Sequence, residues 1–376
     1  MLVKCDSYSI TKKILKIPNL YLLFLIVIMT IRNPLIDLRS DTVTRPSADM
    51  RLAMNRAVTG DDVFAEDPEI NELQIRCAEM FGMEAGLFCP SGTMTNQIAI
   101  SVHTSPGDEV ICDRLSHIYN YEGGGIARLS GASVRLMNGD FGRFTASDVR
   151  LNVNPEDSHY ARTSLVCLED TCNKGGGSIW DISEIKEVSK VARELGLSIH
   201  LDGARLWNSI VARGINNDSK ALVEYGSNFD SISLCLSKGL GCPIGSVLIG
   251  SESFISEAHR ARKVFGGGMR QAGIVASAGI FALENHIARL KIDHLRAKRL
   301  GEAALNHPSV ISHAPIETNI VILELEKGVD SSELVSEWGR NGIHCFPFSS
   351  SSIRFVTHLD ITDEQISGAC NYLSGI

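Results

Sequence analysis

The sequence predicts an α/β protein in which a large domain, built on a mainly parallel sheet covered by helices, precedes a smaller α+β domain. Two observations support this fold class. Short apolar runs alternate with amphipathic segments up to about residue 250, as in repeated strand–helix–strand units. After about residue 285 the pattern changes to one long charged helical stretch, followed by short strands and a helix. We therefore expect an N-terminal extension at 1–35, a large domain at 36–285 and a small domain at 286–376.

The strands of the large domain are predicted from apolar runs of four to seven residues that Gly, Asp or Ser residues bound. Such runs are typical of strands buried on both faces. They lie at residues 86–89, 109–112, 133–137, 164–169, 197–202 and 231–237. Another run, at 246–251, follows the last of these so closely that we expect it to return antiparallel to it.

Helices are predicted where apolar residues recur at helical spacing. In the stretch 67–81, Pro68 suits the first turn, and one face carries Ile70, Leu73, Cys77, Met80 and Phe81. A second amphipathic helix is expected at 182–194. In the C-terminal region we expect a charged helix at 284–305, strands at 319–326 and 351–360, and a helix between the two strands.

Composition limits the class of function. The 376 residues are 44% apolar and 21% charged, which is an ordinary globular ratio. A formal charge of −8 provides no basic field for nucleic acid or anionic lipid, so we expect a small-molecule partner and no nucleic-acid partner. The ten cysteines include no C-x-x-C pair, which fits neither a zinc site nor a small disulfide scaffold. We expect buried free thiols in a reducing compartment, and hence a cytosolic protein with no metal site.

The N-terminus complicates that expectation. Four lysines precede the apolar run 20–31, which looks like the core of a signal peptide. The run is shorter than the roughly 20 residues that a membrane-spanning helix needs, and no small-x-small cleavage site follows it. We favour an extension upstream of a protein that starts at Met29, over an uncleaved anchor or targeting segment and over a cleaved signal.

Polar residues that end the predicted parallel strands are the first candidates for a site, because ligands of open α/β sheets bind at the carboxyl ends of the strands. Four such ends stand out, at 89–96, 168–173, 200–205 and 235–241. Lys238 follows a buried strand, where desolvation favours the reactive amine that Schiff-base chemistry requires. Asp202 ends another strand and could hold a pyridine nitrogen protonated. The alternative is a structural ion pair between the two.

Other candidates are weaker when taken alone. The turn at 91–93 offers backbone N–H groups at a helix N-terminus to an anion such as phosphate, or is an ordinary cap by Ser91. His117 could stack on a flat ring, or could be a satisfied histidine of an aromatic loop. Arginines that could bind a carboxylate or phosphate, but could equally be solvated surface residues, are Arg205, Arg270 and Arg354.

The chain resembles the low-specificity L-threonine aldolases, which are pyridoxal-phosphate (PLP) enzymes of the aromatic amino acid beta-eliminating lyase/threonine aldolase family. The resemblance rests on nine blocks in the family's order, from about Ile36 to the C-terminus, among them DLRSDTVTRPS, LEDTCN, HLDGAR and SKGLG. The blocks lie at 37–47, 60–68, 90–99, 116–125, 168–177, 200–208, 233–250, 265–273 and 351–360. The resemblance implies the fold-type-I architecture, with 36–285 as the PLP-binding domain, and a homo-oligomer, a dimer or a tetramer.

The resemblance also implies a role for each matching position. Lys238 would attach the cofactor, Asp202 would bond its ring nitrogen and His117 would stack on its ring. Gly92 and Thr93 would cradle the phosphate, with Arg270 reaching it from a neighbouring subunit. The substrate carboxylate would be held by Ser40, Arg205 and Arg354. Glu122 and Lys263 are carried over as residues near the site without a defined role.

The reaction that the resemblance implies is cleavage of L-threonine or L-allo-threonine to glycine and acetaldehyde. The base that takes the hydroxyl proton could be a water, His117 or Glu122.

The chain departs from the family at one position. Cys172 stands where the family usually has a histidine near the substrate side chain, so recognition of the β-hydroxyl is in doubt while the cofactor chemistry is unaffected. Two alternatives stay open. One is a PLP-dependent β-eliminating lyase acting on another β-substituted amino acid. The other is a membrane-anchored, catalytically silent PLP-binding protein, which the apolar N-terminal run and Cys172 would favour.

Overall fold

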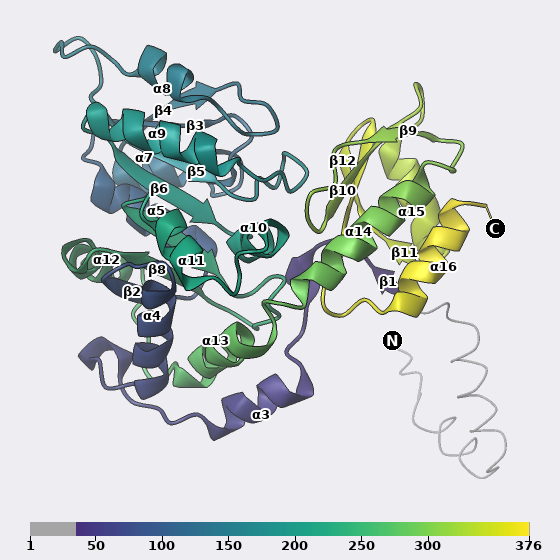
Figure 1. Ribbon diagram of the computed structural model, residues 1–376, viewed down its shortest axis with the longest axis horizontal. Helices are drawn as coiled ribbons and strands as arrows, with labels where there is room; N and C mark the ends of the chain where they lie inside the picture. The colour runs from purple at the N-terminus through teal and green to yellow at the C-terminus, as the bar shows by residue number, and fades with distance from the viewer. Residues whose placement is uncertain (1–34, 376) are drawn as a thin grey trace, which may run out of the picture.

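The large domain is organised around a seven-stranded sheet in the order β2-β8-β7-β6-β5-β3-β4 (Figure 1). The computed structural model describes residues 35–375. Within this sheet β8 runs antiparallel to both of its neighbours, as predicted for the return strand, and the other strands are parallel to one another. The strands are β2 (Ala85–Cys89), β3 (Glu109–Asp113), β4 (Ser133–Met137), β5 (Thr163–Glu169), β6 (Ser198–Gly203), β7 (Ser231–Cys235) and β8 (Ser246–Gly250).

Helices cover both faces of this sheet. The 3-10 helices are η1 (Asp41–Val43) and η2 (Asp62–Phe64). The α-helices are α3 (Ala48–Arg56), α4 (Pro68–Met80), α5 (Gly92–His103), α6 (His117–Asn120), α7 (Gly125–Ser130), α8 (Ala146–Asn152), α9 (Ile182–Glu194), α10 (Leu206–Arg213), α11 (Ser219–Gly226), α12 (Glu252–Val264) and α13 (Gly273–Asn285). The helices predicted at 67–81 and 182–194 are confirmed as α4 and α9, each starting after an aspartate whose side chain caps it.

Strand β6 shows how the two faces are divided. Ile199 and Leu201 belong to the main hydrophobic core, together with apolar residues of α9 such as Ile185 and Val188. The alternating residues His200 and Asp202 face the opposite way and bond to a side chain of α5. Helix α5 therefore lies on the polar face of β6, and the polar residues at the end of the strand point towards it.

The small domain has a four-stranded antiparallel sheet in the order β12-β13-β10-β9, with helices packed on one side. A separate parallel pair joins β1 to β11, so Ile36 and Asp37, at the start of the described chain, lie beside the C-terminal part (Figure 1). The elements are β1 (Ile36–Asp37), α14 (Leu290–Ala304), β9 (Val310–His313), β10 (Ile320–Leu325), α15 (Ser331–Arg340), β11 (Ile343–His344), β12 (Phe346–Ser349), β13 (Ser352–Val356) and α16 (Asp363–Leu373).

The helix predicted at 284–305 is wrong at its start. Helix α13 extends to Asn285, and α14 begins only at Leu290. Between them the Nδ1 atom of His286 lies 2.7 Å from the carbonyl oxygen of Leu240, in the loop after β7. This long-range contact fixes the turn between the two helices, and local sequence periodicity carries no information about it.

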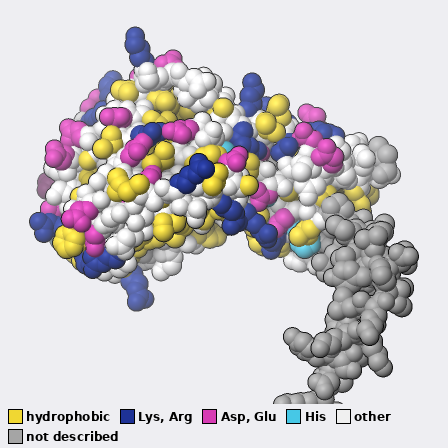
Figure 2. Space-filling view, turned by 90° about the horizontal axis from the view of Figure 1, so that it is seen from below, with side chains coloured by type: hydrophobic (Ala, Val, Ile, Leu, Met, Phe, Trp, Pro, Cys, Tyr) yellow, Lys and Arg dark blue, Asp and Glu magenta, His cyan; other side chains and the backbone are white. Residues whose placement is uncertain are grey.

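The expectations for the N-terminal run lie outside the described residues. Over residues 35–375, no helix is both long enough and apolar enough to cross a membrane. Nine of the ten cysteines lie in the described region, and all nine are free and buried, as expected of thiols that pack as small apolar groups. The cytosolic location stays a prediction. On the face shown in Figure 2, basic, acidic and apolar side chains are interspersed and do not form one basic patch.

Candidate active site

A cavity of about 400 Å³ lies where the carboxyl ends of the central parallel strands face the small domain. The large domain supplies the loops after β3, β5, β6 and β7, and the small domain supplies β12 and β13. Its lining residues are Ser40, Thr42, His117, Tyr121, Asn173, Arg205, Lys238, Phe346, Pro347, Phe348 and Arg354. The structure thus brings together five of the residues singled out from the sequence, namely Ser40, His117, Arg205, Lys238 and Arg354.

Lys238 lies half-buried in the turn that follows β7. Its carbonyl oxygen accepts hydrogen bonds from the Gly241 N–H, at 2.8 Å, and from the Thr44 hydroxyl, at 3.0 Å. Gly241 has a φ of +76°, a conformation that favours glycine, so the turn is specified by the sequence. These contacts fix the backbone of Lys238 and leave its amine on the cavity wall.

Asp202 ends β6 and is almost fully buried. Its Oδ2 atom accepts a hydrogen bond of 2.9 Å from the Asn96 amide, and its Oδ1 atom accepts one of 3.0 Å from the backbone N–H of Ala204. Among the ion pairs of the described residues there is none between Asp202 and Lys238. The structural ion pair considered as an alternative is therefore not formed, and the carboxylate is oriented by neutral donors.

His117 opens α6 at the rim of the cavity. Its backbone N–H donates to Glu169, and its Nδ1 atom lies 2.9 Å from a carboxylate oxygen of Glu122. Burial alone would lower the pKa of His117, but the hydrogen bond to Glu122 and the negative charges of Asp202, Glu122 and Glu169 outweigh it and raise the pKa. Because the carboxylate accepts at Nδ1, the Nε2 atom is left to face other groups.

Glu122 lies behind His117 and does not line the cavity. Its oxygens accept hydrogen bonds from the Asn96 amide at 2.9 Å and the Gln97 amide at 2.6 Å, in addition to His117. Ligand atoms of His117, Glu122 and Asp202 lie within 4.8 Å of one another, a spacing compatible with a metal ion. The Asn96 amide, however, donates to both carboxylates, so the two facing oxygens already have a hydrogen-bond donor.

Glu169, at the end of β5, is a site residue to which the sequence assigned no role. Its two oxygens accept the backbone N–H groups of His117, at 2.8 Å, and Asn173, at 2.9 Å. Burial and the neighbouring charge of Asp202 raise the pKa of Glu169 to about 7, although both hydrogen bonds oppose the shift. It therefore connects the segment that carries His117 to the segment that carries Asn173. The available signal was its place in the strand end 168–173.

Two arginines from different domains meet at Asn173. The Asn173 side-chain oxygen accepts hydrogen bonds from Arg354, at 2.9 Å, and from Arg205, at 3.4 Å. Burial and the neighbouring Arg205 lower the pKa of Arg354 to about 10, so both guanidinium groups are charged at neutral pH. The buried Nε atom of Arg354 has no hydrogen-bond partner among the described residues. This pair of cations with an unpaired donor fits a carboxylate.

Asp41, which sequence reasoning did not single out, fixes one of these arginines. Its two oxygens accept hydrogen bonds of 2.7 Å from Nε and Nη2 of Arg205. Burial would raise the pKa of Asp41, but Arg205, Lys238 and Asn319 together lower it to about 2. Asp41 lies in the 37–47 block on which the family resemblance rests, and this was the available sequence signal.

Gly92 and Thr93 lie at the N-terminus of α5, where the Ser91 hydroxyl caps the helix by accepting from Met94 N–H at 3.2 Å. The first helical amides precede the first intrahelical bond and point out of the helix. A Cβ atom on Gly92 would lie 3.4 Å from the hydroxyl oxygen of Ser246, which is buried and has no partner among the described residues. These amides and this unpaired hydroxyl form a polar cradle of the kind that binds phosphate.

Two residues expected at or near the site, Cys172 and Lys263, lie away from this cavity, and so does Arg270, which was expected to act from a neighbouring subunit. Cys172 is fully buried and absent from the cavity lining; its side chain faces Gly142, where an added Cβ would lie 2.3 Å from the sulfur. Arg270 is exposed and pairs with Asp61 at 3.0 Å. Lys263 lines a separate basic cavity of about 340 Å³ beside His259 and Arg260.

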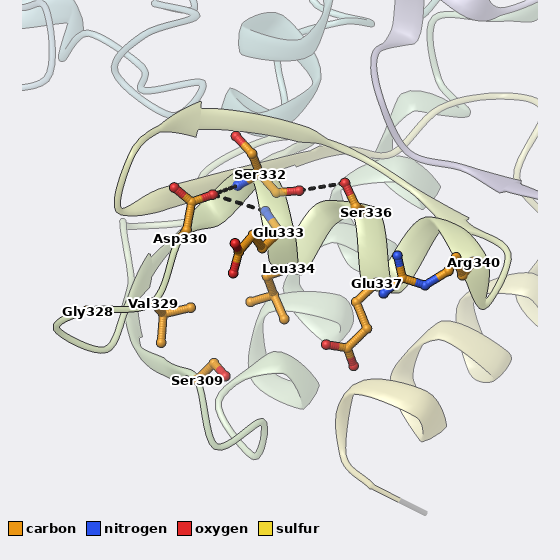
Figure 3. A pocket seen from close by; sticks show the side chains of 10 residues that line it. All are labelled: Ser309, Gly328, Val329, Asp330, Ser332, Glu333, Leu334, Ser336, Glu337 and Arg340. Carbon is orange, nitrogen blue, oxygen red and sulfur yellow. Dashed lines mark hydrogen bonds between the residues drawn. The ribbon is translucent and has the colours of Figure 1, made fainter.

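A larger cavity, of about 690 Å³, lies on the small domain beside α15 (Figure 3). Asp330, Glu333 and Glu337 are among its lining residues, and Arg340 is the one cation there. Asp330 caps α15 by accepting from the backbone N–H groups of Ser332 and Glu333. Because its carboxylates would repel phosphate and carboxylate groups, this cavity does not fit the predicted ligands.

Comparison with known proteins places the chain among a defined set of enzymes. Residues 37–327 match the family described as Beta-eliminating lyase. The chain is 39% identical over 334 residues to the low specificity L-threonine aldolase of Escherichia coli K12, an alignment that covers 89% of this chain and 96% of that one. It is also 39% identical over 338 residues to low-specificity L-threonine aldolase 1 of Arabidopsis thaliana, covering 88% and 93% of the two chains.

A solved structure supports the architecture independently. The threonine aldolase of Leishmania major is 20% identical to this chain, covers 90% of it and 99% of its own length, and superposes with a TM-score of 0.77. At this level of identity the likeness concerns the fold. It confirms the predicted combination of a large, mainly parallel sheet domain and a small C-terminal sheet domain.

Proposed function

The chain belongs to the beta-eliminating lyase family, and from that premise we propose that it is a threonine aldolase, a carbon–carbon lyase that uses PLP to cleave L-threonine or L-allo-threonine into glycine and acetaldehyde. The observation that carries the proposal is the position of Lys238 on the wall of a cavity that also contains two arginines. An amine and a carboxylate clamp are what a reaction on an amino acid requires.

The residues present fit the cofactor. The amine of Lys238 would attach it, and the carboxylate of Asp202, oriented by Asn96 and Ala204, would accept a hydrogen bond from the ring N–H and keep that nitrogen protonated. The phosphate would lie at the N-terminus of α5 on the Gly92 and Thr93 amides, where the unpaired hydroxyl of Ser246 needs a partner. When bound, PLP supplies an electron sink for the pair of electrons released from the broken Cα–Cβ bond.

The substrate carboxylate would be bound by Arg354 and Arg205. Asp41 holds Arg205 by two hydrogen bonds, and Asn173 lies between the two guanidinium groups, so the clamp is formed before substrate arrives. A carboxylate fixed in this way orients the rest of the amino acid, which is how binding selects the bond to be broken. Ser40, on the cavity wall, adds a hydroxyl beside this clamp.

Proton removal from the β-hydroxyl is assigned to His117 or to a water that it holds. His117 lines the cavity, and its Nδ1 atom is already engaged by Glu122, so Nε2 is the nitrogen that can take a proton. Glu122 is the weaker candidate because its side chain is fully buried and its oxygens already accept from three donors.

Arg270 would act in an oligomer, at the phosphate site of a neighbouring subunit. Its side chain is 59% exposed, so its ion pair with Asp61 is screened by solvent and contributes little to stability. Its guanidinium is therefore available to a second copy of the chain, whose phosphate site it would complete.

The test is a product assay with purified protein, PLP and L-threonine. Formation of glycine and acetaldehyde in equal amounts is the expected result. Ammonia and a keto acid would instead identify β-elimination, and neither product pair, from protein that has bound PLP, would favour a catalytically silent protein.

A further inference from the structure

A continuous chain of hydrogen bonds leads from Asp202 through the large domain to its far side. The amide nitrogen of Asn96 lies 2.9 Å from Asp202, and its oxygen lies 3.1 Å from Nε2 of His200. Nδ1 of His200 lies 2.8 Å from the hydroxyl of Ser231, which in turn lies 2.8 Å from Nε2 of His103. The first four of these side chains are almost completely buried.

The fold explains why these residues meet. His200 and Asp202 are two positions apart on β6 and therefore point to the same face, where both bond to Asn96 of α5. On α5, Asn96 and His103 are seven residues apart and share one side of the helix, about 10 Å from each other along its axis. Ser231 of β7 is the register partner of His200. The hydrogen-bond chain thus runs along α5, away from the carboxyl edge of the sheet.

The far end of the chain reaches a surface cavity. His103 lines a cavity of about 310 Å³ together with Glu84, Asp230 and Phe254, and its ring stacks on Phe254 with centroids 4.5 Å apart. The hydrogen-bond chain therefore connects the ring-nitrogen partner of the proposed cofactor site to a place that the mechanism does not use.

Elementary donor and acceptor rules give this chain a single direction. Both amide hydrogens of Asn96 point at carboxylates, those of Asp202 and Glu122, so its oxygen must accept from His200. His200 then carries its proton on Nε2, and its Nδ1 accepts from the hydroxyl of Ser231. Since that hydroxyl hydrogen is used, Ser231 accepts from Nε2–H of His103. Every donor in the chain points towards Asp202.

We propose that His200, Ser231 and His103 are positioning residues, whose polarised hydrogen-bond chain holds the Asn96 amide in the orientation that donates to Asp202. The inference rests on the proposed function in so far as Asp202 is the partner of the cofactor ring. Without this hydrogen-bond chain, the Asn96 amide could rotate so that its oxygen faces Asp202. The Asp202 carboxylate would then lose a hydrogen-bond donor and lie against another acceptor.

The hydrogen-bond chain requires that the imidazoles of His200 and His103 are neutral, each with one donor and one acceptor nitrogen. Burial lowers the pKa of His200 to about 3, with a further contribution from His103. Burial also lowers the pKa of His103 to about 4, although Asp230 opposes the shift. Both rings are therefore neutral across the physiological pH range, in agreement with the geometry.

Neutron diffraction from crystals of the deuterium-exchanged holoenzyme tests the direction of the chain. The expected result is a deuteron on Nε2 of both His200 and His103 and one on the Ser231 hydroxyl, pointing at His200. A deuteron on Nδ1 of His200 would overturn the proposal. This readout concerns the protein's own atoms, so it does not depend on which reaction the enzyme catalyses.

Ser231→Ala tests the consequence for the cofactor. The matched control is Ser189→Ala, which removes another buried hydroxyl, one that donates to the Asn228 carbonyl and is not a member of the hydrogen-bond chain. We expect the PLP dissociation constant of Ser231→Ala to rise about five-fold, the effect of losing one hydrogen bond. We also expect the pH midpoint of the bound cofactor's visible absorption to move upward, because a less firmly protonated ring withdraws fewer electrons. The control should change neither.

The outcomes separate the two proposals. If Ser231→Ala folds, binds PLP as tightly as the wild type and keeps the same pH midpoint, the positioning role is wrong. If the variant and the control are equally affected, the chain serves structure alone, and the proposal is likewise overturned. Failure of the wild type to bind PLP would contradict the proposed function, whereas the deuteron positions would still decide the direction of the chain.

Discussion

Asp41 and Arg205 form a bidentate ion pair in which both nitrogen–oxygen distances are 2.7 Å and both side chains are buried. The two residues are 164 positions apart in the sequence. Asp41 lies in the segment that leads from the small domain into the large one. This connecting segment therefore holds Arg205, one of the two arginines of the carboxylate clamp, in place. Two predictions concern this pair.

Asp41→Asn should weaken both the fold and substrate binding. It leaves the buried guanidinium of Arg205 without a countercharge, and breaking a buried pair costs about 3 kcal/mol. We expect the free energy of unfolding to fall by that order and KM for L-threonine to rise about ten-fold. Urea denaturation and steady-state kinetics measure the two effects. The control Asp157→Asn alters an exposed pair with His159 and should change neither; an unchanged KM in Asp41→Asn would contradict the clamp.

The same pair predicts a pH dependence of stability. The pKa of Asp41 in the folded protein is about 2, below its ordinary value of 3.8. A lowered folded-state pKa stabilises the protein above the unfolded pKa, and this contribution is lost as the pH falls through the folded pKa. The difference in unfolding free energy between the wild type and Asp41→Asn should therefore be constant above about pH 5 and shrink between about pH 4 and pH 2. A difference that grows on acidification would contradict this assignment.

Glu122→Gln should shift the acid limb of the pH profile of kcat/KM. The Glu122 carboxylate contributes to the raised pKa of His117, and glutamine keeps a hydrogen-bond acceptor but removes the charge. If the neutral imidazole of His117 is the base, activity falls as the pH drops through this pKa. We therefore expect the acid limb to move to lower pH. Glu194→Gln, at an exposed pair with Arg150, is the control. An acid limb that stays in place would remove His117 from the role of base.

The large sheet was predictable because apolar residues predominate in its short strands, and Gly, Asp or Ser residues lie at their ends. The short strands of the small domain were harder to predict. Strand β12 is largely exposed, and β1 and β11 have two residues each, so their apolar signal is weak. The break between α13 and α14 depends on a contact between His286 and Leu240, which no local pattern reports.

Some residues of the site were likewise predictable from the sequence, and others were not. Strand ends in the sequence located Asp202 and Lys238, because parallel strands deliver their carboxyl ends to one edge. Asp41 and Asn173 act through contacts with residues far away in the sequence, so their side chains could not be assigned a role before the fold was known. His200 shows an intermediate case: its alternation with Asp202 was visible, but its partner on α5 was not.

Lys238→Ala should remove both colour and activity. If Lys238 attaches PLP covalently, the purified wild type is yellow, and the alanine variant loses the visible band and turnover together. Absorbance spectra and a glycine assay measure the two properties. The control Lys186→Ala removes a surface lysine paired with Glu224 and should retain both. An unchanged visible band in folded Lys238→Ala would refute the assignment.

Cys172 provides the sharpest contrast between sequence position and structure. The family resemblance puts it beside the substrate side chain, yet hydrogen bonds from its N–H to the Ser178 carbonyl, at 3.1 Å, and from the Gly177 N–H to its own carbonyl, at 2.9 Å, fix its backbone in a small bridge. Its sulfur is then directed at Gly142 and away from the cavity. Burial raises the pKa of this thiol, so it is neither charged nor reactive at neutral pH.

Two substitutions at Cys172 separate packing from substrate recognition. Cys172→Ala removes only the sulfur, so we expect the ratio of kcat/KM for L-threonine and L-allo-threonine to stay within about two-fold of the wild type, less than the effect of one hydrogen bond. Cys172→His adds volume against Gly142 and should lower the free energy of unfolding by about 1–3 kcal/mol, the cost of overpacking. Kinetics on both diastereomers and urea denaturation measure these effects. A ratio that changes five-fold or more in Cys172→Ala, with the protein folded and loaded with PLP, would show that the thiol contacts the substrate after all, because a side chain that only packs against Gly142 has no means of distinguishing the two β-carbon configurations.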